Sequence, residues 1–212
     1  MSFYKLYQGD CLDILPTLED NSIDFTISSP PFKTYHGDYD RSEEYYTWFG
    51  QVLRELNRVT KHYSFLFNSS VRIKEICRRF DPERIMMWYK GVMKYAYRYE
   101  PIFIFKHDTD LKINKRIWSD TFKFQPKHKW KVPYENPVAL YNAIMKMVTE
   151  EGDIILDPFI GSGTTMQAAQ DLQRSCIGIE LEAEYCDVVK KRCFGRQFLD
   201  REVEYSFYDC SI

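Results

Sequence analysis

The chain has 212 residues, of which 44% are hydrophobic and 28% are charged, so it is long enough for one globular core and too apolar for a disordered segment. Lys and Arg number 29 against 31 Asp and Glu, and the net charge of −2 excludes a uniformly basic nucleic-acid coat while leaving room for a local basic patch. No apolar run reaches the roughly 18–20 residues of a membrane helix, and charged residues near the N-terminus argue against a signal peptide. We expect a cytoplasmic protein with no membrane partner.

The six cysteines and four histidines are scattered, and no two cysteines form a CxxC pair. Nothing in their spacing is typical of zinc ligands. We expect reduced thiols that serve as small apolar fillers, with no metal and no structural disulfide.

In the first half of the chain, apolar strand-like runs alternate with helical patterns. Strands are predicted at 3–10, 22–28, 62–70, 84–89 and 99–106, and helices at 11–18, 45–59 and 71–80. Pro30 and Pro31 end the second strand, because proline cannot continue a central strand. A polar, Tyr-rich loop at 33–44 follows.

In the second half, the segment 106–131 loses periodicity and gains charge. Its eight Lys and Arg against three Asp give +5, which leaves −7 for the rest of the chain. Helices are then predicted at 137–149, 164–172 and 181–193, and strands at 152–157, 175–180 and in the tail 198–210. This alternation predicts an α/β fold, a doubly wound and mostly parallel sheet in a single domain 1–212, with 106–131 as a short basic insert.

The strand 152–157 runs into a glycine-rich turn at the start of a helix. Gly161 and Gly163 let the backbone approach a ligand at the helix N-terminus, and Glu180 ends the next strand, where dinucleotide-binding folds place a carboxylate on ribose hydroxyls. No lysine follows Gly163, which argues against an ATP-binding P-loop, and Met166 stands where the dinucleotide motif has its third glycine. The pattern indicates a nucleoside ligand with a charged appendage, or else only a tight strand–helix turn.

The sequence DPFIGSGTT (157–165) resembles the S-adenosylmethionine motif of DNA amino-methyltransferases. This resemblance implies S-adenosyl-L-methionine as the cofactor and the Rossmann-like fold of the enzymes that use it. It implies that the turn surrounds the methionine, that Asp157 binds the methionine amino group and that Glu180 takes both ribose hydroxyls. The helix start at Pro137 resembles the start of the helix that precedes the family's cofactor motif. The N-terminal segment GDCLDIL (9–15) resembles the family's first motif, which lies beside the adenine of the cofactor. The implied cofactor residues are Asp10, Cys11, Pro137, Asp157, Phe159, Gly161, Ser162, Gly163, Thr164 and Glu180.

A second signature, Ser29-Pro30-Pro31-Phe32, directly follows the strand 22–28. An exocyclic amino group is planar and weakly nucleophilic, and a site can activate it by accepting both amino hydrogens in a pyramidal geometry. A rigid turn offers the Ser29 hydroxyl and the Pro30 carbonyl for this purpose, and Phe32 offers a surface on which the base can stack. Alone, the four residues are better explained as a strand-terminating turn, and it is their pairing with 157–165 that favours a catalytic role.

SPPF resembles the family's catalytic tetrapeptide, whose Ser form is typical of cytosine-N4 enzymes and whose Asp form is typical of adenine-N6 enzymes. Since SPPF precedes the cofactor motif, the order matches the family's β-type permutation. We therefore predict a site-specific DNA-methyltransferase that acts on cytosine N4, with adenine N6 as the first alternative. RNA or protein-glutamine methylation and a non-catalytic DNA-binding subunit are the others.

A base inside a duplex cannot reach such a site, so the target must be flipped out or unpaired. The basic insert predicts the phosphate contacts, with Lys112, Lys115, Arg116, Lys123, Lys127 and Lys129 as candidates. Arg72, Lys74, Arg78 and Arg79 either extend this basic face or form an ordinary exposed helix surface. The resemblance implies DNA as the partner and leaves a homodimer and a cognate restriction endonuclease, as in restriction–modification systems, open.

Overall fold

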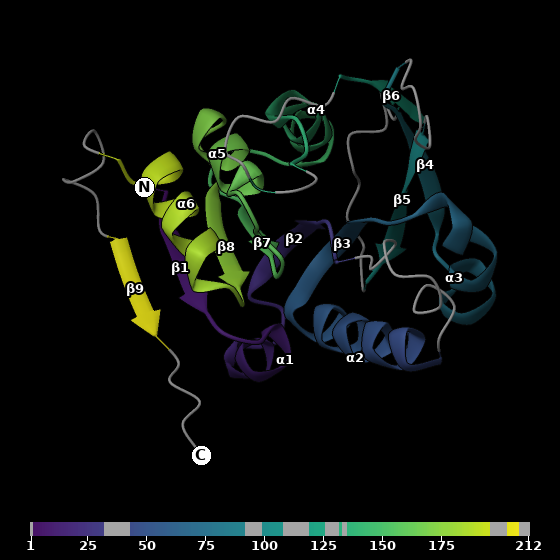
Figure 1. Ribbon diagram of the computed structural model, residues 1–212, viewed down its shortest axis with the longest axis horizontal. Coiled ribbons are helices and arrows are strands. Elements are labelled where there is room, and N and C mark those ends of the chain that lie inside the picture. Colours follow the sequence, from purple (N-terminus) through teal and green to yellow (C-terminus); the bar gives the residue numbers. More distant parts are fainter. Residues whose placement is uncertain are drawn as a thin grey trace.

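The computed structural model describes residues 2–31, 43–91, 99–107, 119–125, 132 and 135–195, and the backbone of 203–207. These residues contain one nine-stranded sheet in the order β6-β4-β5-β3-β2-β7-β8-β1-β9 (Figure 1). Its strands are β1 (Tyr4–Gln8), β2 (Ile23–Ser28), β3 (Thr60–Phe67), β4 (Arg84–Tyr89), β5 (Tyr99–Lys106), β6 (Thr121–Lys123), β7 (Ile154–Asp157), β8 (Ser175–Glu180) and β9 (Val203–Phe207). Eight strands run the same way and β5 alone is antiparallel to its neighbours β3 and β4.

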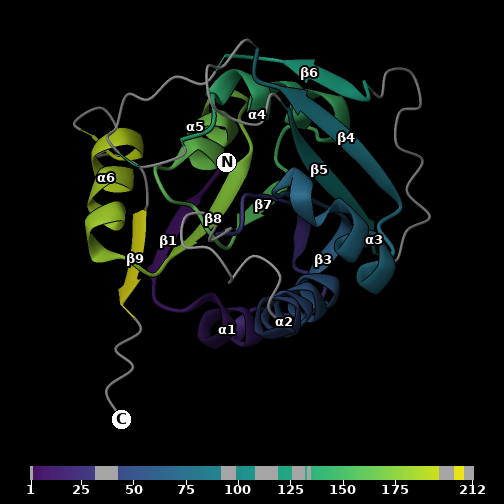
Figure 2. The ribbon, with the colours of Figure 1, turned by 45° about the vertical axis from the view of Figure 1, so that its right-hand side comes forward.

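Helices cover both faces of the sheet (Figure 2). They are α1 (Cys11–Ile14), α2 (Glu43–Val59), α3 (Ile73–Phe80), α4 (Val138–Val148), α5 (Thr164–Asp171) and α6 (Ala183–Cys193), with 3₁₀ turns η1 (Leu15–Thr17) and η3 (Ser70–Arg72). The predicted doubly wound, mostly parallel α/β fold is confirmed. Within the described residues, no helix is long and apolar enough to span a membrane.

The core is split by the sheet into two layers. Side chains of α4, α5 and α6 pack with Phe25, Ile27 and Ile155 on one face. Side chains of α1, α2 and α3 pack with Leu66 and Leu156 on the other. Because successive residues of a strand point to opposite faces, the continuous apolar strands in the sequence feed both layers.

The third strand and the helix at 71–80 differ from their predicted bounds. The third strand begins at Thr60, directly after α2, and ends at Phe67 rather than at residue 70. Asn68 leaves the strand but keeps a sheet-like hydrogen bond, since its N–H donates to the Pro101 carbonyl at 3.1 Å. The helix predicted at 71–80 begins as the 3₁₀ turn η3, so its α-helical part starts only at Ile73.

Candidate active site

The two sequence signatures meet where β2 and β7 lie side by side in the sheet. Both strands end at the same edge, because they are parallel. After β2 the next helix, α2, covers one face, and after β7 the helix α5 covers the other. The connections that leave these two neighbouring strands therefore go to opposite faces of the sheet, and a crevice forms between them at the strand ends. Ligands of open α/β folds bind in this crevice.

The Ser-Pro-Pro turn starts where β2 stops. Ser28 is the last strand residue, Ser29 is half-buried, Pro30 is buried and Pro31 is exposed. Two prolines in succession fix the backbone of the turn, so the Ser29 side chain and the Pro30 carbonyl leave the sheet from a rigid base. Phe32, the predicted stacking surface, lies outside the described residues.

Asp157, the last residue of β7, ties this turn to the glycine-rich loop. Its Oδ1 accepts a hydrogen bond from the hydroxyl of Ser28 and one from the Phe159 N–H at 3.0 Å, and its Oδ2 accepts from the hydroxyl of Thr165. The residue is only 3% exposed, and burial raises the pKa of its carboxyl to about 6 despite these donors. Ser28 is 129 positions from Asp157 in the sequence, so this carboxyl holds two distant segments together.

The raised pKa of Asp157 makes a prediction about stability. The unfolded chain releases this proton near pH 3.8 and the folded protein holds it to about 6, so the free energy of unfolding falls as the pH rises through this window. The difference corresponds to about 3 kcal/mol. We expect the free energy of unfolding of wild type, measured with urea, to fall by about this much between pH 4 and 6 relative to that of Asp157→Asn. The buried His107, whose pKa burial lowers to about 4, is common to both proteins and cancels. A gap that does not change with pH would contradict the assignment.

Glu180 holds the glycine-rich loop from the neighbouring strand β8. Its Oε2 accepts from the Gly161 N–H at 2.8 Å, and its Oε1 accepts from the Glu182 N–H at 3.0 Å. Burial raises the pKa of this carboxyl. The carbonyl of Glu180 also accepts from the Gly9 N–H at 2.9 Å, which places Asp10 and Cys11 at the same edge. Asp10 is exposed and caps α1, since its Oδ1 accepts from the Leu12 N–H at 2.9 Å, whereas Cys11 is buried.

The two glycines of the loop have different surroundings. Both have positive φ, +51° at Gly161 and +82° at Gly163. Among the described residues, a Cβ at Gly161 would meet only the Phe159 carbonyl oxygen, at 3.9 Å, so these residues leave that side of the turn open to a ligand. A Cβ at Gly163 would instead lie 3.2 Å from the Cys193 sulfur on α6. Gly163 therefore allows α5 and α6 to pack closely, and its role as a point of ligand approach stays a prediction.

A buried arginine that the sequence did not single out fixes the other side of the loop. Arg192 of α6 donates to Glu135 Oε1 at 2.9 Å, to the Ser162 carbonyl and hydroxyl at 3.0 Å each, and to the Thr164 hydroxyl at 3.2 Å. The side chains of Arg192 and Glu135 are 5% and 4% exposed. The Thr164 hydroxyl also lies 3.2 Å from the Asn136 carbonyl, so the lead-in to α4 at Pro137 is held against the loop.

Removing the Arg192 guanidinium is expected to be strongly destabilising. In Arg192→Met, the buried Glu135 carboxylate loses its charge partner, a situation that typically costs about 3–5 kcal/mol of unfolding free energy. Lys190→Met is the matched control, because it removes a cation from the same turn of α6 whose partner Asp187 lies 3.3 Å away at the surface. We expect the control to cost about 0–1 kcal/mol in urea unfolding. Equal losses in the two variants would contradict a buried role for Arg192.

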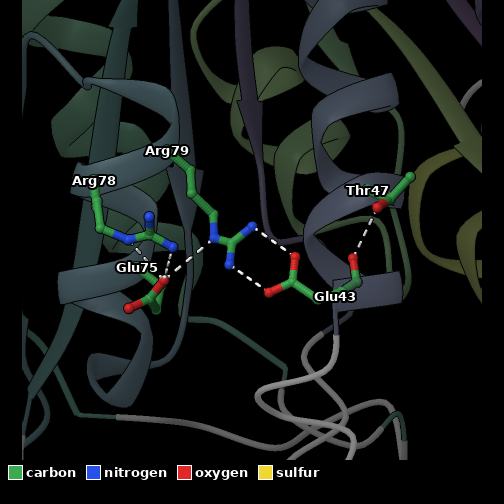
Figure 3. Close-up of polar contacts among 5 residues, drawn as sticks. All are labelled: Glu43, Thr47, Glu75, Arg78 and Arg79. Carbon is green, nitrogen blue, oxygen red and sulfur yellow. Dashed lines mark hydrogen bonds and ion pairs between the residues drawn. The ribbon is translucent and has the colours of Figure 1, made fainter.

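The basic residues of the 70–80 region are engaged in internal contacts (Figure 3). Arg79 donates to both oxygens of Glu43 at 2.9 and 2.6 Å and to Glu75 at 3.2 Å, and Arg78 donates to Glu75 at 2.8 Å. The prediction that Arg72 lies on an exposed helix surface is wrong. Its side chain is buried, 3.8 Å over the Tyr45 ring, with a hydrogen bond to Asn68. Lys74 is exposed.

Of the predicted phosphate contacts, the structure describes one. Lys123 ends β6 and is exposed at the edge of the sheet where β2 and β7 end, because β6 runs parallel to these strands. Lys112, Lys115, Arg116, Lys127 and Lys129 lie outside the described residues, as does most of the loop 33–44.

The sequence analysis missed the residues that connect the two signatures. Ser28 and Arg192 carry no motif signal of their own, and Thr165, the last residue of the 157–165 motif, was assigned no role. Their roles follow only from contacts in the folded chain. Trp48 of α2 is another such residue, since its ring lies 5.5 Å from the half-buried Phe159 ring. Its position on the apolar stripe of a predicted helix indicated only a core residue.

Comparison with known proteins defines the class first. M1.HpyAVI in complex with SAM is 25% identical in sequence, with a TM-score of 0.68 over 90% of this chain and 100% of that chain. The PvuII cytosine-N4-specific DNA methyltransferase is 18% identical, with a TM-score of 0.73 over 100% and 97% of the two chains, which is a likeness of fold. The fold is thus that of the DNA methyltransferases.

The family is shown by the sequence. The DNA methylase family model of N6 and N4 methyltransferases matches residues 23–191, and the chain belongs to this family. The type II methyltransferase M.BglII of Bacillus subtilis is 27% identical over 241 aligned positions, which cover 87% of this chain and 67% of that protein.

Proposed function

We propose that this DNA methyltransferase transfers a methyl group to the exocyclic N4 amino group of a cytosine that is flipped out of DNA. The observation that carries the proposal is the Ser28–Asp157 hydrogen bond, because it joins the Ser-Pro-Pro turn to the glycine-rich loop. The next residue, Ser29, gives the catalytic tetrapeptide its Ser form, which favours cytosine N4 over adenine N6 as the target.

The cofactor is S-adenosyl-L-methionine, which supplies an electrophilic methyl group when bound. The described residues fit it. Gly161 has a free side on which the methionine part can lie, and Glu180 ends β8 at the place where α/β folds bind ribose hydroxyls. We assign the methionine amino group to Asp157 Oδ2, which accepts one hydrogen bond in this structure. Asp10 and Cys11 lie on the adenine side, beyond the Gly9–Glu180 hydrogen bond.

The residues of the turn act on the target amino group. The Ser29 hydroxyl oxygen and the Pro30 carbonyl accept one amino hydrogen each, which localises the nitrogen lone pair and directs it at the methyl group. The rigid turn holds these two acceptors in place before the base arrives, so little reorganisation is needed. After transfer, the cationic nitrogen loses a proton to water through Ser29. Lys123 and the other basic residues of 106–131 contact the phosphates.

Product analysis tests this proposal directly. The purified protein is incubated with mixed-sequence single- and double-stranded DNA and methyl-labelled cofactor, and the nucleosides are identified by mass spectrometry. We expect labelled N4-methylcytosine. Labelled N6-methyladenine would overturn the assignment of the base while leaving the methyltransferase intact. No labelled nucleoside in either DNA would contradict the proposal and favour a DNA-binding subunit without turnover.

A further inference from the structure

Glu100 has a buried carboxyl oxygen that the proposed mechanism does not use. The residue is 4% exposed, and its Oε2 is paired with the ammonium group of Lys90. Its Oε1 is buried and has no hydrogen-bond partner among the residues that the structure describes. Buried polar atoms are almost always hydrogen-bonded, so this oxygen points to a partner that the described residues do not supply, such as a bound ligand.

The topology places Glu100 at the same edge of the sheet as Ser29. Because β5 is the antiparallel strand, it begins where the parallel strands end. The Asn68 N–H donates to the carbonyl of Pro101, next to Glu100, and β3 is the single strand between β5 and β2. Glu100 and the Ser-Pro-Pro turn are therefore separated by one strand.

Glu100 also lies near the junction of the two signatures. Glu100 and Ile102 are two positions apart on β5, so their side chains point to the same face of the sheet. Phe67 and Tyr141 lie in the core layer on this face. The rings of Phe67 and Tyr141 are stacked with centroids 5.2 Å apart. Burial raises the pKa of the Tyr141 hydroxyl, and the charge of the Asp157 carboxylate adds to this effect. Tyr141 thus lies near Asp157 and packs on the face of the sheet to which Glu100 belongs.

The Lys90 ammonium keeps the orientation of Glu100 fixed. It lies 4.6 Å over the ring of Trp88, which faces Glu100 directly in the β4–β5 pairing. With Oε2 held on this side, Oε1 is left as the atom that can reach a ligand at the edge of the sheet.

We propose that Glu100 recognises the target base by a hydrogen bond from its free oxygen to the ring nitrogen beside the target amino group. This inference rests on the proposed role of Ser29. When the amino group is held at Ser29 and Pro30, the adjacent ring nitrogen extends away from the turn. That nitrogen is N3 in cytosine and N1 in adenine, and it is an acceptor in both. Glu100 must therefore carry a proton on Oε1, and burial raises the pKa of its carboxyl in this direction.

The experiment compares enzyme variants on DNA with and without this ring nitrogen. Product analysis identifies the methylated site, and oligonucleotides are made with cytosine or 3-deazacytosine there, or with adenine or 1-deazaadenine if the product is N6-methyladenine. The variants are Glu100→Gln, whose amide can still donate, and Glu100→Met, which has similar volume and cannot. For each protein, kcat/KM is measured on both DNAs, and cofactor affinity and thermal unfolding are measured alongside.

For wild type and Glu100→Gln, we expect kcat/KM to fall about 10-fold or more on the deaza base, which is the effect of a base-reading hydrogen bond. For Glu100→Met, we expect a similar fall on the natural base and a ratio near 1 between the two DNAs. A Glu100→Met ratio equal to that of wild type would overturn the inference, as would a Glu100→Gln ratio near 1. If Glu100→Met does not fold, the double variant with Lys90→Met, which leaves no unpaired charge, is tested in its place. Failure of wild type to methylate DNA would instead contradict the proposed function.

Discussion

Replacement of Ser29 by alanine is expected to slow methyl transfer about 100- to 1000-fold, the usual effect of removing one preorganised hydrogen-bonding group from a transition state. The affinity for S-adenosyl-L-methionine should stay close to that of wild type. The reason is that the neighbouring Ser28, and not Ser29, makes the hydrogen bond to Asp157. The rate is measured in single turnover with saturating enzyme, and the cofactor affinity by calorimetry with the demethylated product.

The adjacent Ser28 provides a matched control. Ser28→Ala leaves Asp157 Oδ1 with only the Phe159 N–H as a donor, which is expected to lower the free energy of unfolding by about 1–3 kcal/mol and to weaken cofactor binding. The two serines thus separate the catalytic role from the positioning role. A Ser29→Ala enzyme with the wild-type single-turnover rate would remove Ser29 from the mechanism, whatever the outcome for Ser28.

The second large effect is expected from substitution of the two glycines of the cofactor loop. Substitution of Gly163 should mainly lower stability, and substitution of Gly161 should mainly lower cofactor affinity. In Gly163→Val, the new side chain starts 3.2 Å from the Cys193 sulfur and 3.4 Å from Val189, at a φ of +82°. Overpacking and backbone strain together are expected to lower the free energy of unfolding by about 2–5 kcal/mol. Cofactor binding is lost because α5 and α6 can no longer hold the loop.

In Gly161→Ala, we expect strain alone to cost about 1–2 kcal/mol, because a Cβ there has no close neighbour in the part of the chain that the structure describes. The methyl group of the new alanine instead occupies the side of the turn assigned to the methionine. We therefore expect cofactor affinity to fall about 10-fold or more, while the protein stays folded. Urea unfolding and calorimetry on both variants separate the two effects. Unchanged cofactor affinity in Gly161→Ala would contradict the assignment of the loop.

The sequence by itself determined the alternation of strands and helices, the fold class and the two signature turns. Apolar periodicity reports which elements form, and glycine and proline report where the chain must turn, so local patterns were sufficient for these features. The sequence also placed Ser29 directly after one strand and placed Asp157 and Glu180 at the ends of two others, and the parallel sheet brings these ends to one edge.

Only the tertiary structure decided which of these residues touch. Arg192 and Glu135 are 57 positions apart, and no local pattern distinguishes this arginine from the exposed basic residues around it. The same holds for Arg72, which the sequence placed at the surface and the structure buries over Tyr45. The unpaired oxygen of Glu100 is likewise a property of its neighbours on β4, β3 and α4. Contacts of this kind depend on strand order and helix packing, which bring together residues that are distant in the chain, and sequence periodicity carries no information about them.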